Sequence, residues 1–335
     1  MMDLILTILS KVFTVTFFQK AVTQGVPLLF GATGEILTEK AGNLNLGIPG
    51  IMYMGAVGGL TGAFFYEQST PEPSGAVGVL IAFLCAILFS AFGAFIYALL
   101  TITLRANQNV TGLALTTFGI GVGNFIGGSL SKIAGTAGQI TVYTTGQAFR
   151  TTIPGLSQIP VVGPLLFSYG FLTYLSLALA LFFAYLLART RCGLNLRAVG
   201  ENPATADAAG INVIRYKYGF TILGGAVAGL GGLYFVMEYL GGTWQNNGFG
   251  DRGWLAIALV IFALWRPLRA IWGSLLFGGL YILFAYIPLG DAAQEILKML
   301  PYLVTILVLV VSSLRRRAEE QPPASLGLSY FREDR

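Results

Sequence analysis

Long apolar runs separated by short polar segments dominate the pattern of this chain. A helix needs about 20 mainly apolar residues to cross the hydrocarbon layer of a membrane. Runs of about that length lie near residues 48–66, 76–104, 108–130, 165–188, 219–239, 270–289 and 295–314. Residues 254–265 form a shorter apolar run, and residues 4–37 hold one span or two because basic residues and a proline interrupt them. The pattern predicts nine or ten spans, with ten preferred.

Composition leads to the same class of protein. Of the 335 residues, 55% are hydrophobic and 10% are charged, whereas a soluble domain has about 25% charged residues. We therefore predict an all-α, polytopic helical bundle in a membrane, with lipid as a partner. A formal net charge of +5 fits basic loops on the cytoplasmic side of such a protein, so we expect no nucleic-acid partner.

The basic residues also predict the orientation of the chain. Because loops rich in Lys and Arg stay in the cytoplasm, we assign the basic segment of residues 189–217 to that side. Alternation of the spans then places Arg105, Arg266 and the arginine run 315–317 on the same side, which puts the C-terminus in the cytoplasm. Residues 1–317 form the predicted membrane domain. Residues 318–335 form a polar tail, which we expect to be disordered.

The basic segment contains a short predicted helix. Asn202 suits a helix N-cap, Pro203 suits the first helical position, and Gly210 suits the exit from the helix. Alanines between them favour about two turns, a length of roughly 10 Å. So short a helix is marginal by itself in water. We therefore expect that either its own membrane domain or a cytoplasmic partner holds it.

Residues 41–51, AGNLNLGIPGI, place polar groups and helix breakers directly beside an apolar run. Broken backbone at membrane depth is tolerated only inside protein or along a watery cavity. One interpretation is therefore a substrate path or a re-entrant turn. The other is an ordinary cytoplasmic turn just outside the bilayer, and the sequence leaves both open.

Missing residue types exclude several classes of chemistry. The chain has no His and two separated cysteines, Cys85 and Cys192. A zinc site therefore lacks its usual ligands, and catalytic groups that require His are excluded. No GxxxxGKS or GxxxxGKT loop for phosphate occurs, and no ladder of carboxylates runs through the spans. We expect no cofactor on this chain, no enzymatic activity, and an energy source on another polypeptide.

Four segments in order resemble a known family. They are residues 38–59 (TEKAGNLNLGIPGIMYMGAVGG), 104–115 (LRANQNVTGLAL), 193–213 (GLNLRAVGENPATADAAGINV) and 252–268 (RGWLAIALVIFALWRPL). Together they resemble the permease subunits of ATP-binding-cassette (ABC) importers for simple sugars and nucleosides. This group is related to ribose-type and branched-chain amino-acid permeases. The resemblance covers nearly the whole chain, although Pro49 stands where the family often has an acidic residue.

The resemblance implies the partners and the site of action. It implies a second, non-identical permease, one or two ABC ATPase subunits that bind ATP and magnesium, and an extracytoplasmic binding protein or lipoprotein. The expected location is the inner membrane of a bacterium. The short helix is then the coupling helix that docks on the ATPase. The coupling residues implied are Arg197, Glu201, Asn202, Pro203, Ala206, Asp207, Ala209 and Gly210. Of these, Pro203, Ala206 and Ala209 form the expected docking surface.

Polar and aromatic side chains are the candidates for the substrate pathway. Amides and hydroxyls hold a neutral sugar without binding charge, and aromatic faces stack on a base. The candidates are Asn43, Asn45, Gln108, Asn109, Thr111, Phe118, Asn124 and Phe125. The residues near position 108 suit a helix end at the cytoplasmic surface equally well. The family also holds its substrate weakly in the membrane, so a tight site is not required.

Two other classes of protein fit the sequence less well. A secondary transporter of a small neutral solute uses broken helices and ions near the midplane of the membrane. The few carboxylates within the spans and the capped loop helix count against it. A membrane-embedded enzyme that acts on lipid needs clustered Asp, His or Arg at an interface, and the sequence shows no such cluster.

Overall fold

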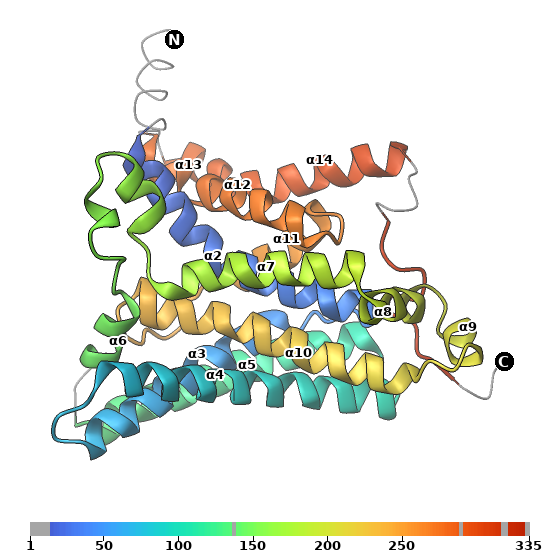
Figure 1. The fold of residues 1–335 in the computed structure, drawn as a ribbon, viewed down its shortest axis with the longest axis horizontal. Coiled ribbons are helices and arrows are strands. Elements are labelled where there is room, and N and C mark those ends of the chain that lie inside the picture. Colours follow the sequence, from blue (N-terminus) through green and yellow to red (C-terminus); the bar gives the residue numbers. More distant parts are fainter. Residues whose placement is uncertain (1–13, 136–138, 288–290, 316–320, 332–335) are drawn as a thin grey trace, which may run out of the picture.

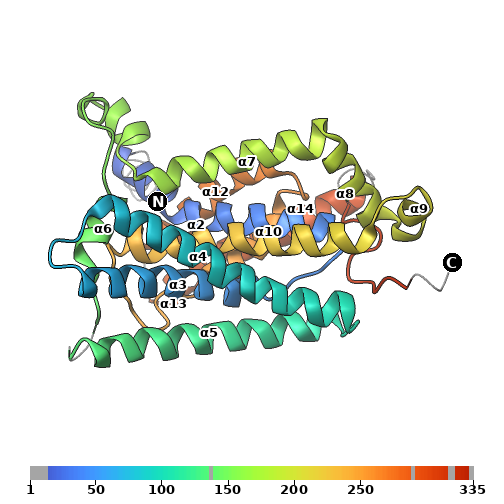
Figure 2. The same cartoon turned by 60° about the horizontal axis from the view of Figure 1, so that its bottom comes forward.

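The computed structural model describes residues 14–135, 139–287, 291–315 and 321–331, which form a bundle of helices without a strand. Figure 1 shows most of the long helices running along one direction, and Figure 2 places α6 at one end and α9 at the other. We call these the α6 end and the α9 end. The helices are α2 (Val15–Lys40), α3 (Ile48–Ser69), α4 (Gly75–Ala98), α5 (Gln108–Ile133), α6 (Tyr143–Phe149), α7 (Phe171–Arg189), α8 (Arg191–Glu201), α9 (Pro203–Ala208), α10 (Val213–Tyr234), α11 (Arg252–Phe262), α12 (Pro267–Tyr286), α13 (Asp291–Lys298) and α14 (Leu300–Arg315).

Within the described residues, six helices are long and apolar enough to cross a membrane. They are Ile48–Ser69, Gly75–Thr103, Gln108–Ile133, Phe171–Arg189, Val213–Tyr239 and Pro267–Tyr286. They confirm the all-α, polytopic class. The apolar helices α11 and α14 are shorter, and α2 is a single helix that continues through Pro27. The choice between nine and ten spans stays a prediction, since residues 1–13 lie outside the described part of the chain.

Helices α3 and α10 form the centre of the bundle. Within the apolar windows of these two spans, 83% and 89% of residues are buried, whereas the corresponding share for α5 is 33%. Small residues allow the close contact: a Cβ atom on Gly55 of α3 would collide with the backbone of Gly229 in α10. Within lipid the hydrophobic effect does not drive helices together. Glycines stabilise the contact between α3 and α10 because they let the two backbones approach closely. Figure 2 shows α5 along one edge of the bundle.

The segment between α2 and α3 is non-helical and buried. After Lys40 the chain turns at Gly42, whose φ of 83° suits a residue without a side chain. The carbonyl of Leu44 then accepts a 2.5 Å hydrogen bond from the Tyr97 hydroxyl. The amide of Leu44 donates to Oε1 of Gln108 over 2.7 Å. Side chains from α4 and α5 thus satisfy backbone groups that no helix satisfies.

The same segment reaches well into the bundle. Thr116, eight residues after the start of α5, donates its hydroxyl to the carbonyl of Leu46 over 2.7 Å. Eight residues of helix correspond to a depth of about 12 Å. Asn45 is fully buried, with 0% exposure. The segment is therefore broken backbone buried inside the protein. The choice between a substrate path, a re-entrant turn and a cytoplasmic turn just outside the bilayer stays a prediction.

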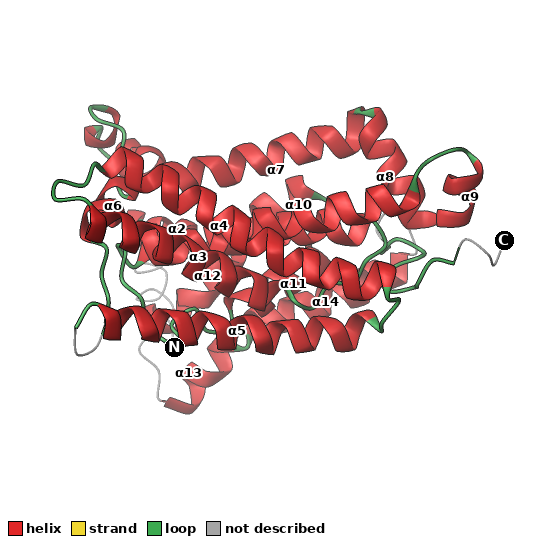
Figure 3. Cartoon of the chain, turned by 90° about the horizontal axis from the view of Figure 1, so that it is seen from below, coloured by secondary structure: helices red, strands yellow, loops and turns green. Residues whose placement is uncertain are grey.

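The basic segment of residues 189–217 folds into two helices, of which the sequence predicted one. For α9, Asn202 Oδ1 accepts a hydrogen bond from the amide of Thr205 over 3.0 Å, Pro203 takes the first position, and Gly210 has a φ of 85°. The predicted cap, start and exit are confirmed. The second helix, α8, was not predicted; Thr190 caps it by accepting a 3.1 Å hydrogen bond from the amide of Gly193. Figure 3 shows α9 protruding beside α8 at one end of the bundle.

The described part of the C-terminal tail, residues 321–331, packs against the α9 end. Ser325 is buried, and its hydroxyl and amide both donate to the carbonyl of Gly200, over 2.6 and 3.0 Å. The Tyr330 hydroxyl donates to Oδ2 of Asp207 over 2.8 Å. The expectation of a disordered tail is therefore wrong for these residues. Serine and tyrosine find acceptors on α8 and α9 that the tail's own composition does not reveal.

Candidate functional sites at the two ends of the bundle

The candidate pathway residues separate into two groups along α5. Gln108 and Asn124 lie sixteen residues apart in this helix, which corresponds to about 24 Å. Gln108 lines a pocket at the α9 end together with Asn43, and Asn124 lines a pocket at the α6 end together with Phe125. The structure therefore brings the predicted residues together in pairs, at opposite ends of one helix.

The pocket at the α6 end has a volume of about 640 Å³. Its lining is mostly amides, hydroxyls and aromatic rings, and Lys132 is the charged member. The lining residues are Asn124, Phe125, Gly128, Ser129, Ser131, Lys132, Gln139, Trp244, Gln245 and Asn246. They come from α5, from the segment that follows it, and from the loop after α10. A site of this kind offers hydrogen bonds and aromatic contact to a solute without charge.

Hydrogen bonds fix the loop after α10 against α5. Nδ2 of Asn124 donates to Oδ1 of Asn247 over 2.8 Å, and the backbone N–H of Asn247 donates back to Oδ1 of Asn124 over 3.1 Å. The indole of Trp244 donates to Oδ1 of Asn246 over 2.7 Å. Gly127 makes room for that indole, because a Cβ atom at this position would overlap the ring. The pocket wall is thus held rigidly from both sides.

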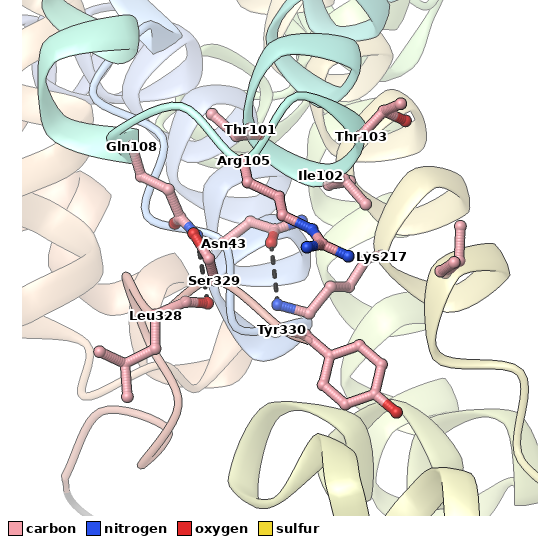
Figure 4. Close-up of a pocket in the computed structure, with 11 residues that line it drawn as sticks. Asn43, Thr101, Ile102, Thr103, Arg105, Gln108, Lys217, Leu328, Ser329 and Tyr330 are labelled. Atoms are coloured by element: carbon pink, nitrogen blue, oxygen red, sulfur yellow. Dashed lines mark hydrogen bonds between the residues drawn. The ribbon is translucent and has the colours of Figure 1, made fainter. Parts of the chain in front are cut away.

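The pocket at the α9 end is smaller, about 250 Å³, and carries positive charge. Figure 4 shows the ends of Arg105 and Lys217 approaching the same space. Nζ of Lys217 lies 3.3 Å from Oδ1 of Asn43, and Nδ2 of Asn43 donates to Thr221 over 2.8 Å. The complete lining is Asn43, Thr101, Ile102, Thr103, Arg105, Gln108, Ile214, Lys217, Leu328, Ser329 and Tyr330.

The other candidate pathway residues line neither pocket. Asn45 is buried and shapes the broken segment. Its backbone N–H donates to Oε1 of Glu35 over 3.0 Å, and its Oδ1 accepts from the backbone N–H of Gly47 over 2.9 Å. Thr111 is buried in α5, whereas Asn109 and Phe118 are exposed, the latter by 52%. A part for these residues in transport stays a prediction.

The side chains implied for coupling do not share one exposed surface. Ala206 is 3% exposed and packs with Val199 and Val213, so its place in the expected docking surface is wrong. It anchors α9 because its short side chain fits between α8 and α10. Ala209 is exposed and Pro203 is half-buried.

The polar residues of the same group differ from one another as well. Arg197 and Asn202 are exposed. Glu201 already accepts a hydrogen bond from the amide of Ala324 over 3.3 Å, and Asp207 accepts from Tyr330. The C-terminal segment thus occupies two of the acidic groups expected to face a partner.

Several lining residues were missed as site residues. Arg105 and Lys217 served only as markers of orientation, and Trp244 and Asn246 were not considered. The run Trp244-Gln-Asn-Asn is polar and aromatic between two apolar runs, the same signal that marked residues 41–51. No pattern in the sequence predicts that Leu328 to Tyr330 line a pocket, because the residues around them do not indicate that the C-terminal segment packs near α5.

Comparisons with known proteins agree on one family. Residues 17–309 match the family described as "Branched-chain amino acid transport system / permease component". The nucleoside ABC transporter permease protein NupC of Lactococcus lactis subsp. cremoris is 34% identical over 294 residues, covering 85% of this chain and 88% of that protein. The guanosine ABC transporter permease protein NupQ of Bacillus subtilis is 33% identical over 288 residues, covering 84% and 87%.

An archaeal relative extends the range of named solutes. The putative glucose ABC transporter permease protein TsgC13 of Haloferax volcanii is 33% identical over 330 residues, covering 91% of this chain and 94% of that protein. No solved structure matches the chain.

Proposed function

This chain belongs to the family of branched-chain amino acid transport system permease components, and we propose that the solute it carries is a nucleoside or a simple sugar, with a nucleoside preferred. The chain is the transmembrane subunit of an ABC importer, and ATP is hydrolysed on a separate subunit. It catalyses no covalent chemistry itself. The two relatives named for nucleosides and guanosine, at 34% and 33% identity, support the preferred solute.

The observation that carries this proposal is the neutral lining of the pocket at the α6 end. Amides of Asn124, Gln139 and Asn246 offer both donors and acceptors to ribose hydroxyls and to the edge of a base. Phe125 and Trp244 supply the aromatic surface on which a base stacks. With Lys132 as the charged residue of the lining, a branched-chain amino acid would find no carboxylate for its ammonium group.

The distribution of charge supports an orientation for the bundle. The α9 end carries Arg105, Lys217 and the basic residues of α8, and the chain continues from α14 into the 315–317 arginine run. Since positive loops stay inside, the α9 end faces the cytoplasm in this proposal. The C-terminus is then cytoplasmic, and the α6 end faces the outside of a bacterial inner membrane, where a binding protein or lipoprotein delivers the solute.

The protruding α9 is the proposed contact with the ATPase. Its exposed groups, Ala209 among them, and the exposed Arg197 on α8 form the surface that docks there. The other exposed surface of interest is the outer face of α5. Leu113, Phe118 and Phe125 are 47%, 52% and 74% exposed on this helix, which joins the two pockets. We assign this face to the second permease and to the pathway between the two subunits.

Uptake by cells that produce the complete transporter tests the solute. Labelled guanosine should accumulate, and the accumulation should survive an ionophore but cease when ATP is depleted. Replacing Asn124 by Leu should lower uptake by roughly tenfold, since it removes the two hydrogen bonds to Asn247 that position the pocket wall as well as the amide available to the solute. Uptake that follows the ion gradient, or that competes with leucine but not with nucleosides or glucose, would contradict the proposal.

A further inference from the structure

The pocket at the α9 end contains a buried cation without an anion. Lys217 is 3% exposed, and its ammonium group lies at hydrogen-bonding distance from one acceptor, Oδ1 of Asn43 at 3.3 Å. Among the residues that the structure describes, no carboxylate forms an ion pair with Lys217 or with Arg105. Taking an ammonium group out of water without a partner is unfavourable. An anion beside this cation would be stabilised, and the adjacent cavity supplies the space for one.

Arg105 adds a second cation with free donors. Its guanidinium lies 4.3 Å from the ring centre of Phe331. Its N–H donors form no hydrogen bond with any described residue. Its backbone has a φ of 55°, a conformation uncommon for a residue with a side chain. Arg105 is exposed and lines the pocket, where Figure 4 shows its guanidinium near Lys217.

The rest of the lining suits an oxyanion. Ser329 and Thr103 contribute hydroxyls, the latter hydrogen-bonded with the Tyr218 hydroxyl, whereas the Thr101 hydroxyl already donates to the carbonyl of Tyr97. Among the described residues, no acidic residue lines the cavity. The N-terminus of α5 begins beside it at Gln108, and a helix N-terminus also favours negative charge. Two cations of different shape, hydroxyl donors and a volume of about 250 Å³ match a phosphate group better than a carboxylate or a halide, because phosphate offers acceptors in several directions.

We propose that this pocket binds a phosphate-class anion, either a soluble phosphate monoester or the headgroup of an anionic lipid. The site does not depend on which solute the protein carries. It lies under the C-terminal segment, because Leu328, Ser329 and Tyr330 form part of its wall. That segment also contacts α8 and α9 through Ser325 and Tyr330. A bound anion therefore holds the C-terminal segment and α9 against α5.

Binding of inorganic phosphate to the full-length chain tests the site. The purified protein is placed in nanodiscs of phosphatidylcholine, and labelled phosphate is titrated at constant ionic strength with chloride as the balancing anion. We expect saturable binding and slower amide exchange in residues 321–331. Lys217→Met should weaken binding by roughly tenfold or more, since a charge-assisted hydrogen bond is lost. The matched control Lys132→Met removes the cation of the other pocket and should leave binding unchanged.

A second variant, Asn43→Asp, separates loss of the anion site from misfolding of Lys217→Met. Asn43→Asp keeps the size of the side chain and places a carboxylate beside Lys217, so phosphate should no longer bind although the chain stays folded. Repeating the titration with phosphatidylglycerol in the nanodiscs separates the two sources. Competition by that lipid identifies a headgroup, and its absence identifies a soluble phosphate ligand. Failure of the wild type to bind phosphate, or equal binding by wild type, Lys217→Met and Asn43→Asp, overturns the proposal.

Discussion

The pockets at the two ends of α5 differ in charge and in what holds their walls. At the α6 end the lining is mainly neutral, and paired amides of Asn124 and Asn247 fix the wall. At the α9 end two cations face the cavity, and the wall includes the C-terminal segment. One helix thus connects a rigid neutral pocket with a charged pocket whose cover is a separate segment. The difference suggests that solute recognition and control of the coupling end are separate tasks in this subunit.

The largest effect should come from filling the space beside Trp244. Gly127→Val would force the indole out of its position, because even a Cβ atom overlaps the ring. Overpacking of this kind costs about 1–3 kcal/mol, and the displaced ring would close the neutral pocket. Uptake of labelled guanosine by cells with the complete transporter should fall by about tenfold or more. Phosphate binding at the α9 end should be unchanged.

Gly121 supplies the matched control in the same helix. A Cβ atom at this exposed position meets nothing within 4 Å. Gly121→Val should therefore leave the pocket and its uptake intact, apart from any contact with the second permease. Equal loss of uptake in both variants would mean that α5 tolerates no added side chain, and the special role of the Trp244 wall would be wrong.

A smaller effect is expected at the exit of α9. Gly210 has a φ of 85°, and a Cβ atom there meets nothing, so the strain of Gly210→Val lies in the backbone alone. Left-handed backbone costs about 1–2 kcal/mol for a residue other than glycine. Solute-stimulated ATPase activity of the complete transporter should fall several-fold, while the pocket at the α6 end stays intact. Asn adopts this conformation more readily, so Gly210→Asn should retain most of the activity.

Loss of the α9 cap should have a milder result. Asn202→Ala removes the acceptor for the amide of Thr205, and a lost N-cap costs about 1 kcal/mol. Amide exchange in α9 should accelerate by about fivefold, which follows from that free energy. Exchange in α3, at the centre of the bundle, is the internal reference. An unchanged rate in α9 would show that Ala206 and the C-terminal segment hold this helix without its cap.

The smallest effect concerns the cover of the charged pocket. Tyr330→Phe deletes one hydrogen bond, to Oδ2 of Asp207, worth about 0.5–1.5 kcal/mol. Amide exchange in residues 321–331 should rise modestly, and guanosine uptake should change little. A large loss of uptake would contradict the separation of tasks between the two ends, because it would tie the C-terminal cover directly to solute passage.

Features set by short-range interactions were predictable from the sequence, whereas features set by contacts between distant residues were not. The cap and exit of α9 were predictable because Asn202, Pro203 and Gly210 act on backbone within a few residues of themselves. The prediction that Ala206 belongs to an exposed docking surface was wrong, because the burial of so small a residue depends on where α8 and α10 lie. The role of the pathway candidates on α5 stays a prediction, and their spacing in the sequence did not reveal that Gln108 and Asn124 would line two separate pockets.

By itself the sequence determined the membrane class, the helical runs, the broken segment before α3 and the capped helix in the basic loop. Hydropathy and local backbone preferences act over a few turns of chain, so they can be recognised without a fold. Only the tertiary structure decided that Trp244 meets Gly127, that Lys217 faces a cavity without a carboxylate, and that the C-terminal segment closes it. Trp244 and Gly127 are 117 positions apart, and the hydrogen bond between Gln108 and Leu328 joins residues 220 positions apart. Packing of the helices brings such residues together.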